Sequence, residues 1–463
     1  MPMRDQINLK RWIILVFLLM ISMTFLFLQL LSLKAIDSTL LSRFQALKSL
    51  QGLLSNRGRK NDVLNQLEVF TDVGQKHGAP LFLFHPLLFD PQVSEVIQPE
   101  TNGCRLLCGH ECFVFGVINS KWEKGQRNSL STLISRFMSG LHTQGFLTAC
   151  DKVPEPWFDS SKDFLSIKSI LSSCNITKAD VVIKLVIFYD RKSYLWRGPI
   201  QGITAATLFK YPAAHTRFPI VEKVIDGIPI SIPADLKKLT SETSQSQFTG
   251  CNLSNAQAYY GKYGRDVSQD AVLFKKKAFE VLSTAINTLD RLGVRFWLSS
   301  GTCLGWFRQC DIIPHSKDVD LGIWIKDYNS LLIAEFEKSG LLLKHRFGRI
   351  DDSFELSFRT EEDYVKLDIF FFYEEKEYMW NGGTQAKTGK KFKYIFPKFT
   401  LCWTEFLLMK VRIPCETESY IMANYGRNWQ IPIKEWNWKE SPPNVRENGQ
   451  WDEKDWDEVI QLF

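Results

Sequence analysis

The sequence predicts a mixed α/β protein, in which two folded units follow an N-terminal membrane helix and a stem. The chain has 463 residues, and a domain usually takes about 100–200 residues, so two domains are expected. Apolar residues make up 45% of the chain and charged residues 23%. These are ordinary globular values, which exclude a largely disordered, collagen-like or coiled-coil protein. Apolar runs typical of strands alternate with helical patterns in both halves, which indicates the α/β class.

The overall charge gives little information about the substrate. A formal net charge of +6 is small for this length, and no stretch has the dense Lys/Arg stripe that binds a phosphate backbone. We therefore expect no nucleic-acid partner. The 14 Trp residues are unevenly placed, and ten of them lie beyond residue 290.

The first structural element that the sequence predicts is a retained membrane anchor at 12–33. This run has no charged residue, and about 20 apolar residues span a bilayer as a helix. A cleaved signal peptide is the alternative, but its apolar region is about 7–15 residues long and ends at small residues. The run here is longer and continues into Lys34-Ala-Ile-Asp37. Residues 1–11 would then form a cytoplasmic tail.

Basic residues flank the anchor on both sides, so the positive-inside rule barely decides its orientation. Other features favour a large lumenal domain that follows the anchor. Asn175-Ile-Thr177 and Asn252-Leu-Ser254 are glycosylation sequons, which are used only in the secretory lumen. An even number of cysteines is compatible with disulfides in an oxidising compartment. The ten cysteines are Cys104, Cys108, Cys112, Cys150, Cys174, Cys251, Cys303, Cys310, Cys402 and Cys415.

A stem at 34–74 and a first α/β domain at 75–250 are expected next. The stem is polar, with sparse apolar positions. Strand-like runs of this domain are Pro80–Phe84, Phe113–Val117 and Val181–Phe188. A helix-like stretch lies at Ser129–Gly140. The polar stretch Lys237–Gly250 is the best candidate for a linker.

A second domain is expected at 271–463. Apolar residues between Phe274 and Leu292 repeat at three- and four-residue spacing, which predicts an amphipathic helix that Gly293 ends. Strand-like runs follow at Val294–Leu298, Leu321–Ile325 and Val365–Phe372.

The chemistry is expected in this second domain, where three patterns occur in order. The first is a strand that continues into Ser299-Ser-Gly-Thr-Cys-Leu-Gly305 and a helix. Small residues let a ligand approach the backbone, and the N–H groups at a helix start bind phosphate oxygens. Ser300, Gly301 and Thr302 are therefore candidate phosphate ligands, although Ser-Gly turns alone are common.

The second and third patterns are acidic. Asp318-Val-Asp320 begins a strand, and residues i and i+2 of a strand face the same side, so both carboxylates project together while Val319 faces the core. Asp368 lies inside an apolar strand, where a carboxylate is costly without a partner. A shared Mg²⁺ or Mn²⁺ would be such a partner, because these ions prefer oxygen ligands.

The order of these patterns is that of the nucleotidyltransferase superfamily, with a mixed sheet. It predicts that Asp318, Asp320 and Asp368 are catalytic metal ligands. Three other readings remain. In the first, Asp318 and Asp320 decorate a turn and Asp368 pairs with Lys366 or another base. The second is a Golgi glycosyltransferase that uses the Asp318/Asp320 pair with a sugar nucleotide, and the third is a non-catalytic Golgi scaffold.

The stretch Phe296–Ile325 resembles the motif of the LicD family of phosphocholine and polyol-phosphate transferases. It contains a tryptophan, then Gly301-Thr-Cys-Leu-Gly-Trp-Phe-Arg308, then Ile313-Pro314, then the acidic pair. The resemblance is dense after about residue 270. One departure is that His315, Ser316 and Lys317 stand where members of the family commonly have further acids, which leaves a second strongly held metal in doubt.

The resemblance implies a Golgi type II membrane enzyme. It would transfer ribitol 5-phosphate from CDP-ribitol to the N-acetylgalactosamine of the phosphorylated core M3 O-mannosyl glycan of α-dystroglycan, with CMP leaving. Implied partners are a second ribitol-phosphate transferase of the family, a ribitol xylosyltransferase and protein O-mannose N-acetylglucosaminyltransferase. Binding of the acceptor or of a second copy of the chain by the first α/β domain is a hypothesis that rests only on the size of that domain. Asp368 would either share the metal or take the proton of the attacking hydroxyl.

Some candidate residues have two readings. Arg308 is either a phosphate clamp or half of a surface salt bridge. Lys387, Lys390 and Lys391 belong to the acid-free run Thr384–Lys398, which is a solvated face or a loop that closes on CDP or on the acceptor's phosphate. In the same run, Phe392 and Tyr394 could stack on cytosine or sugar.

The cluster Cys104, Cys108, His110 and Cys112 suggests zinc, but its spacing and the expected compartment favour disulfide or free-thiol use. His315 is a possible ligand or base, or a surface residue.

Overall fold

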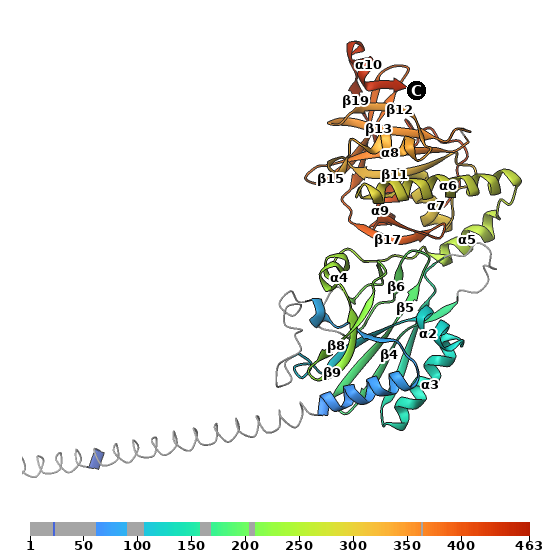
Figure 1. Ribbon diagram of the computed structural model, residues 1–463. Coiled ribbons are helices and arrows are strands. Elements are labelled where there is room, and N and C mark those ends of the chain that lie inside the picture. The colour runs from blue at the N-terminus through green and yellow to red at the C-terminus, as the bar shows by residue number, and fades with distance from the viewer. Residues whose placement is uncertain (1–21, 24–61, 90–105, 158–167, 203–208, 363) are drawn as a thin grey trace, which may run out of the picture. The chain divides into compact units, whose positions relative to one another are not determined.

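The computed structural model describes residues 22–23, 62–89, 106–157, 168–202, 209–362 and 364–463. They form a mixed α/β protein, which confirms the predicted class. The chain divides into two compact units, Met1–Val69 with Asn102–Gly109, and Phe70–Thr101 with His110–Phe463. The second unit contains all the strands described below (Figure 1).

The predicted tail at 1–11, the anchor at 12–33 and the stem up to residue 61 lie outside the described residues, apart from Ser22 and Met23. Among the helices that the structure does describe, none is both long and apolar enough to cross a membrane. The anchor therefore stays a prediction. The last part of the predicted stem is helical, because a helix covers 62–76. Its Phe70 ring lies 5.0 Å from that of Phe115.

A first sheet occupies the region where the first α/β domain was predicted. Its strand order is β1-β2-β5-β4-β3, and β6 pairs with both β5 and β7. The pair β2–β5 is parallel, and the other pairs are antiparallel. The strands are β1 (Leu81–Leu83), β2 (Cys112–Ile118), β3 (Leu147–Pro154), β4 (Ser169–Lys178), β5 (Val181–Asp190), β6 (Leu195–Arg197) and β7 (Ala213–His215), and β8 (Ile220–Ile225) and β9 (Ile228–Pro233) form a separate hairpin.

The helices of this region include the one predicted near 129–140. It is α3 (Leu130–Thr143), which Ser129 caps by accepting a hydrogen bond from the Thr132 N–H. The others are η1 (Pro86–Phe89) and α2 (Asn119–Gln126).

The stretch Lys237–Gly250 differs from the linker that its polar composition suggested. Its first half folds as part of α4 (Leu236–Thr243), with Asp235 as the N-cap, and Leu239 is buried. Its sparse apolar residues pack on one side, which is enough for a short helix whose other face is polar.

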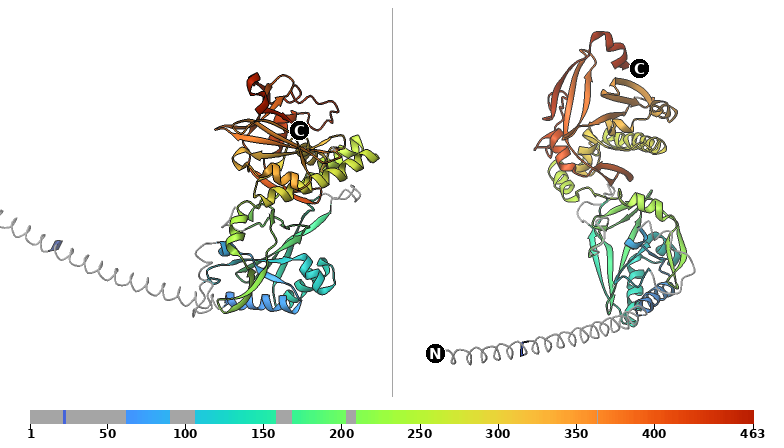
Figure 2. Two further views of the ribbon diagram at one scale, coloured as in Figure 1. Left: turned by 45° about the horizontal axis from the view of Figure 1, so that its top comes forward. Right: turned by 90° about the vertical axis from the view of Figure 1, so that its left-hand side faces the viewer.

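The second sheet has nine strands in the order β19-β16-β15-β14-β13-β12-β20, and β11 pairs with both β14 and β10. Figure 2 shows α6 running along one face of it. The strands are β10 (Phe296–Leu298), β11 (Asp318–Trp324), β12 (Leu342–Arg349), β13 (Asp352–Arg359), β14 (Lys366–Glu374), β15 (Tyr378–Gln385), β16 (Lys390–Pro397), β19 (Val445–Gln450) and β20 (Ile460–Leu462), with the hairpin β17 (Leu401–Phe406) and β18 (Met409–Pro414) apart.

The helices of this half are α5 (Leu253–Tyr263), α6 (Gln269–Arg291), α7 (Ser300–Gln309), η4 (Ile325–Asp327), α8 (Leu332–Lys338), α9 (Thr417–Tyr425), η5 (Glu453–Asp455) and α10 (Trp456–Val459). The predicted amphipathic helix is α6. Gly293 follows its end with a φ of 68°, in the left-handed region that glycine tolerates best.

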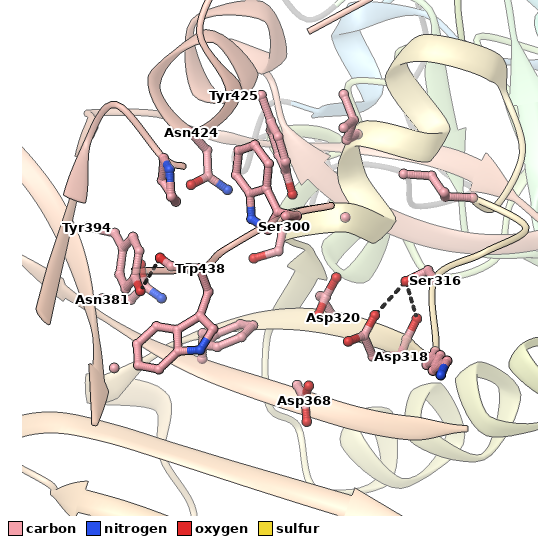
Figure 3. Close-up of a pocket in the computed structure, with 18 of the residues that line it drawn as sticks. Ser300, Ser316, Asp318, Asp320, Asp368, Asn381, Tyr394, Asn424, Tyr425 and Trp438 are labelled. Carbon is pink, nitrogen blue, oxygen red and sulfur yellow. Dashed lines mark hydrogen bonds between the residues drawn. The ribbon is translucent and has the colours of Figure 1, made fainter. Parts of the chain in front are cut away.

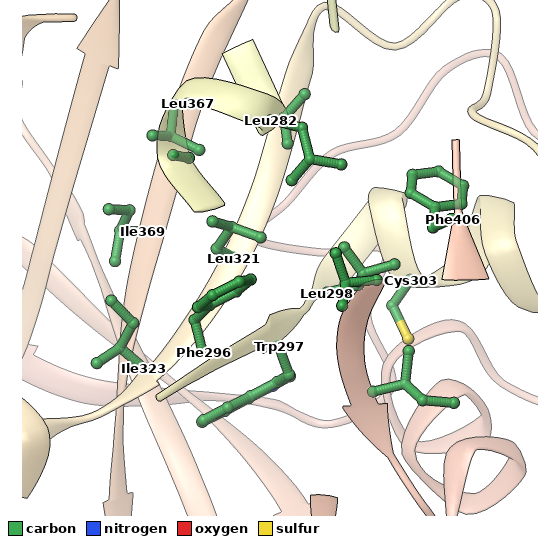
Figure 4. Packing of buried hydrophobic residues seen from close by; sticks show 14 of the residues in the cluster. Leu282, Phe296, Trp297, Leu298, Cys303, Leu321, Ile323, Leu367, Ile369 and Phe406 are labelled. Atoms are coloured by element: carbon green, nitrogen blue, oxygen red, sulfur yellow. The ribbon is translucent and has the colours of Figure 1, made fainter. Parts of the chain in front are cut away.

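The core of this half lies between α6 and the sheet. Leu282 of α6, Leu321 of β11 and Leu367 of β14 are fully buried in one apolar cluster (Figure 4). Because side chains alternate along a strand, the residues between these apolar positions face the opposite side of the sheet. Burial of one face therefore fixes which residues of β11 and β14 are left for chemistry.

Trp297 packs on that opposite face, close to the residues of the site. Its ring lies 4.5 Å from Trp324 and 5.0 Å from Phe372, and it is fully buried. Gly322 pairs with Trp297 across β10 and β11, and a Cβ at Gly322 would lie 2.3 Å from the Trp297 ring. Only glycine leaves room for this indole.

The substitution Gly322→Ala should therefore destabilise the protein by about 1–3 kcal/mol, because an added methyl overpacks a filled core. Denaturant unfolding of the purified full chain measures this change. Gly261→Ala is the matched control, because a Cβ at Gly261 of α5 has no atom within 4 Å. We expect the control to be neutral or slightly stabilising. Equal stability of the two variants would contradict the packing argument.

Candidate functional site

Three carboxylates converge on the face of the sheet opposite α6. The parallel pairing of β11 and β14 places Asp320 directly beside Asp368 and Asp318 beside Lys366. Asp318, Asp320 and Asp368 each place a carboxylate oxygen within 4.8 Å of the others, and Figure 3 shows the three side chains turned toward one another. The strand register thus brings together residues almost 50 positions apart in the sequence.

Each carboxylate is held by neighbours. The Thr302 N–H donates to Oδ2 of Asp320 at 3.2 Å, and the Thr302 hydroxyl accepts the Asp320 N–H at 2.8 Å. The Ser316 hydroxyl donates to Asp318, and the Ser357 hydroxyl donates to Asp368. Thr302 was predicted to bind phosphate, but in the structure its N–H and its hydroxyl both bond to Asp320 and position it.

Lys366 supplies a positive charge inside this cluster. Its Nζ lies 3.1 Å from Oδ2 of Asp368 and 3.8 Å from Oδ2 of Asp318. Burial acts to lower the pKa of Lys366, but the charges of Asp368 and Asp318 outweigh it and raise the pKa. The sequence could have predicted this contact, because Lys366 is two positions from Asp368 and lies on the same face of the strand.

The cluster carries excess negative charge. Burial raises the pKa of Asp320 well above its ordinary value, and the charges of Asp318 and Asp368 add to this effect. One lysine offsets only one of three carboxylates. The group is therefore short of positive charge when all three are ionised, and a divalent cation bound by oxygen ligands fits both its charge and its chemistry.

The N-terminal end of α7 lies beside the carboxylates. Ser300 and Gly301 line the same cavity as Asp318 and Asp320, as the small-residue turn predicted. A Cβ at Gly301 would lie 3.2 Å from Oδ2 of Asp320. Ser300 has a φ of 39°, which is an uncommon backbone conformation for a residue other than glycine. The first-turn N–H groups of a helix attract anions.

The cavity has a volume of about 620 Å³. Its basic lining residues are Arg308, His315, Lys317, His345, Lys366 and Lys434. Arg308 and Lys434 both lower the pKa of His315, Lys366 contacts two carboxylates, and Lys317 precedes Asp318.

Arg308 is buried, its guanidinium lies 4.8 Å above the Tyr259 ring, and its nitrogens donate to Gln309. Burial lowers the pKa of this arginine. A buried guanidinium on the cavity wall is not half of a surface salt bridge, so the clamp reading fits its position better.

The lysines of the predicted run do not line the cavity. Lys387 lies in the turn between β15 and β16. Lys390 is 3.9 Å from Glu447, and Lys391 is 2.6 Å from Asp352. The run has no acid in its own sequence, but the neighbouring strand and a distant hairpin provide acids in space. Of the two aromatic candidates, Phe392 is buried against Trp438, and Tyr394 lines the cavity.

The other end of the cavity is lined by amide and aromatic side chains. Asn381 and Tyr394 are direct cross-strand partners on β15 and β16, Asn424 comes from α9, and Trp438 comes from the segment after it. All four line the cavity and are labelled in Figure 3. Except for Tyr394, none of them was predicted, because no local pattern connects residues from such distant elements.

The cysteines are mostly paired. Disulfides join Cys150 to Cys174, Cys251 to Cys310, and Cys402 to Cys415, and Cys108 is also disulfide-bonded. Cys112 and Cys303 are free thiols. Cys104 lies outside the described residues. A bonded Cys108 favours the disulfide reading of the Cys104–Cys112 cluster over a zinc site, as expected.

The two sequons occupy different environments. Asn252 is exposed, and its side chain caps α5 by accepting a hydrogen bond from the Asn255 N–H. Asn175 is half-buried on β4, where Oδ1 accepts a hydrogen bond from Lys184.

Comparison with known families gives two matches that cover most of the chain. Residues 5–279 match the model described as "Fukutin N-terminal". Residues 293–416, which contain all three clustered carboxylates, match the model described as "LicD/FKTN/FKRP, nucleotidyltransferase domain".

Curated proteins agree with these matches. The chain is 43% identical over 411 residues to the human protein named "Ribitol-5-phosphate transferase FKTN", which covers 85% of this chain and 87% of that protein. It is 31% identical over 98 residues to the mouse protein named "Ribitol 5-phosphate transferase FKRP", which covers 20% of each chain. An uncharacterized protein of Caenorhabditis elegans is 29% identical over 246 residues, 50% of this chain and 61% of its own length.

The raised pKa of Asp320 gives a pH-dependent stability. A carboxyl whose pKa is higher in the folded than in the unfolded state favours folding most at low pH, and this contribution is lost as the pH rises from about 4 through the folded-state pKa. In EDTA, the melting temperature of Asp320→Asn should therefore exceed that of the wild type, and the difference should grow between about pH 4 and pH 8.

Thermal melts of the full chain across this pH range measure the margin, and Asp452→Asn, at an exposed carboxylate, is the control. Added Mg²⁺ or Mn²⁺ should raise the melting temperature of the wild type more than that of Asp320→Asn. A margin that does not change with pH would contradict the assigned electrostatics.

Proposed function

This chain belongs to the fukutin family of LicD-domain proteins, and from this premise we propose that it transfers ribitol 5-phosphate from CDP-ribitol to a glycan. The proposed acceptor is the N-acetylgalactosamine of the phosphorylated core M3 O-mannosyl glycan of α-dystroglycan. The name of the human relative supports the ribitol-phosphate transferase activity.

The observation that supports catalysis most directly is the carboxylate cluster at the cavity. Asp318, Asp320 and Asp368 crowd three acids into one partly buried place, at a cost in free energy that a scaffold would have no reason to retain. We propose that they hold Mg²⁺ or Mn²⁺. The cation would offset the negative charge that the pyrophosphate oxygens carry during the reaction.

The remaining groups of the chain would bind and orient the substrates. Ser300 and Gly301 at the start of α7 would receive phosphate oxygens, and Arg308 would clamp the same group with its planar fork. The acceptor hydroxyl oxygen bonds to the ribitol-bearing phosphorus while the bond from that phosphorus to the CMP oxygen breaks, and the hydroxyl proton passes to a base.

The sequence allows two roles for Asp368, as a metal ligand or as that base. In the structure, both oxygens of Asp368 already accept hydrogen bonds, one from Ser357 and one from Lys366. These bonds stabilise the ionised form and weaken it as a base. We therefore propose that Asp368 holds charge in the site, while the proton leaves to another acceptor.

We propose a Golgi membrane location, with a single-pass type II anchor and a lumenal catalytic domain. The disulfides support an oxidising compartment. Proposed partners are fukutin-related protein, a ribitol xylosyltransferase, protein O-mannose N-acetylglucosaminyltransferase and a second copy of this chain. The relation to the FKRP sequence supports a shared glycan context.

Loss of one metal-binding carboxylate should abolish transfer. With CDP-ribitol and a phosphorylated core M3 glycopeptide, the full chain in detergent should add the mass of one ribitol phosphate. Asp318→Asn, or EDTA with the wild type, should lower kcat/KM by about a thousandfold, because an oriented charge at the reacting group is worth about 3–4 kcal/mol.

Asp452→Asn is again the control, because it removes an exposed carboxylate of the same domain and should leave the rate unchanged. Mass spectrometry of the glycopeptide identifies the transferred group. Transfer of a hexose from a UDP-sugar, or full activity in Asp318→Asn, would contradict the proposed function.

The proposed lumenal location predicts an N-glycan on Asn252. Ser254→Ala removes this sequon but keeps the Asn252 side chain that caps α5, so stability should not change. In cells, the variant should lose the mass of one glycan, as judged by gel mobility before and after peptide N-glycosidase treatment. An unglycosylated wild type would contradict exposure of this site to the lumen.

A further inference from the structure

The cavity has two chemically distinct ends. One contains the carboxylate cluster, Lys366 and the start of α7. The other, the amide–aromatic end, is formed by Asn381, Gly383, Tyr394, Asn424 and Trp438 and is seen on the left of Figure 3. Such a division suits a reaction in which a charged donor meets a neutral sugar.

Asn381 supplies the sharpest evidence for a ligand at this end. It is only 6% exposed, and its Oδ1 has no hydrogen-bond partner among the described residues. A buried carbonyl oxygen without a donor costs free energy. Asn381 lines the cavity, but Oδ1 itself is buried, so a ligand N–H or O–H group reaches it only when the amide rotates about χ2. Asn424, 7% exposed, lines the same cavity with a second amide.

The aromatic residues of this end form a wall. The Tyr394 hydroxyl donates to the carbonyl oxygen of Trp438 at 2.9 Å, which fixes this residue in place. A Cβ at Gly383 would lie 3.3 Å from the Trp438 ring and 3.4 Å from that of Tyr394, so both rings lie close to the bare backbone. Trp438 is 40% exposed. Flat aromatic faces beside amides suit the apolar faces and hydroxyl groups of a pyranose.

The charges at this end disfavour a phosphate. Glu355 lines the cavity and pairs with His345 at 3.3 Å. Burial and the charge of Glu355 both raise the pKa of Tyr394, which places this carboxylate near the wall. Lys366, by contrast, pairs with Asp368 and Asp318 of the carboxylate cluster. A neutral, hydrogen-bonding group therefore fits this end better than the pyrophosphate does.

Reaction geometry supports the same assignment. In displacement at phosphorus, the attacking and leaving oxygens lie on opposite sides of the phosphorus. If CMP leaves on the basic side of the carboxylate cluster, then the attacking sugar must approach from the other side. In Figure 3, the labelled side chains of the amide–aromatic end lie to one side of the three carboxylates.

We propose that the amide–aromatic end binds the acceptor's terminal N-acetylhexosamine, with Asn381 Oδ1 accepting a hydrogen bond from its amide N–H or a hydroxyl group and Trp438 packing against the ring. This inference rests on the proposed function and specifies where its acceptor binds. Asn381 and Trp438 act here as specificity residues that set acceptor affinity.

The test uses the full chain and Asn381→Leu, which keeps the side-chain volume but removes the amide. The KM for the glycopeptide should rise roughly tenfold, as expected for one lost hydrogen bond in a buried site. The affinity for CMP with Mn²⁺, measured by titration, should change less than about twofold, which also shows that the variant is folded. Trp438→Ala should produce the same pattern.

Asn65→Leu makes the same substitution at an exposed position of the helix at 62–76 and should change neither quantity. A loss of CMP affinity of about tenfold with an unchanged glycopeptide KM would overturn the proposal and place cytosine at this end. Unchanged values for both ligands would overturn it as well.

Saturation-transfer NMR of the glycopeptide, without donor, separates this inference from the proposed function. If the wild type transfers no ribitol phosphate but still binds the glycopeptide in a manner that Asn381→Leu abolishes, then the activity is wrong and the sugar site stands. If transfer occurs and binding does not depend on Asn381 or Trp438, then the site is wrong and the activity stands.

Discussion

Repulsion among three carboxylates is the constraint on which the rest of the site depends. Asp318, Asp320 and Asp368 are forced together by the register of two parallel strands, and burial of the opposite face under α6 prevents these strands from turning. The fold thus gives up part of its stability to concentrate negative charge. Lys366 relieves some of this repulsion, and the remaining charge creates affinity for a cation.

The hydrogen bonds around the cluster explain how it stays ordered. Thr302 bonds to both the backbone and the side chain of Asp320, so the start of α7 cannot shift without moving a carboxylate. Ser316 and Ser357 each donate a hydrogen bond to the carboxylate of one of the other two acids. The small-residue turn and the acidic strands, which are separate motifs in the sequence, are joined by these hydrogen bonds in the structure. The proposed substrate and cation sites would therefore be positioned together.

Local patterns in the sequence were enough to predict the elements that carry the acids. Strand periodicity placed Asp318 and Asp320 on one face, and the helical repeat predicted α6 up to Gly293. These patterns did not predict the lysine pairings, because Asp352 comes from another strand and charge balance across a sheet depends on register. Asn381 was missed for the same reason: its proposed role depends on burial and on cavity residues that adjoin it only in three dimensions.

Gly301 limits how chains of this kind can diverge. A side chain at this position would press on an oxygen of Asp320, the carboxylate least able to move because Thr302 holds it on two sides. Related sequences with a bulky residue there would be expected to have lost the reaction even if all three acids remained. A single small residue thus offers a way to tell active members from degenerate copies when the acidic residues alone cannot.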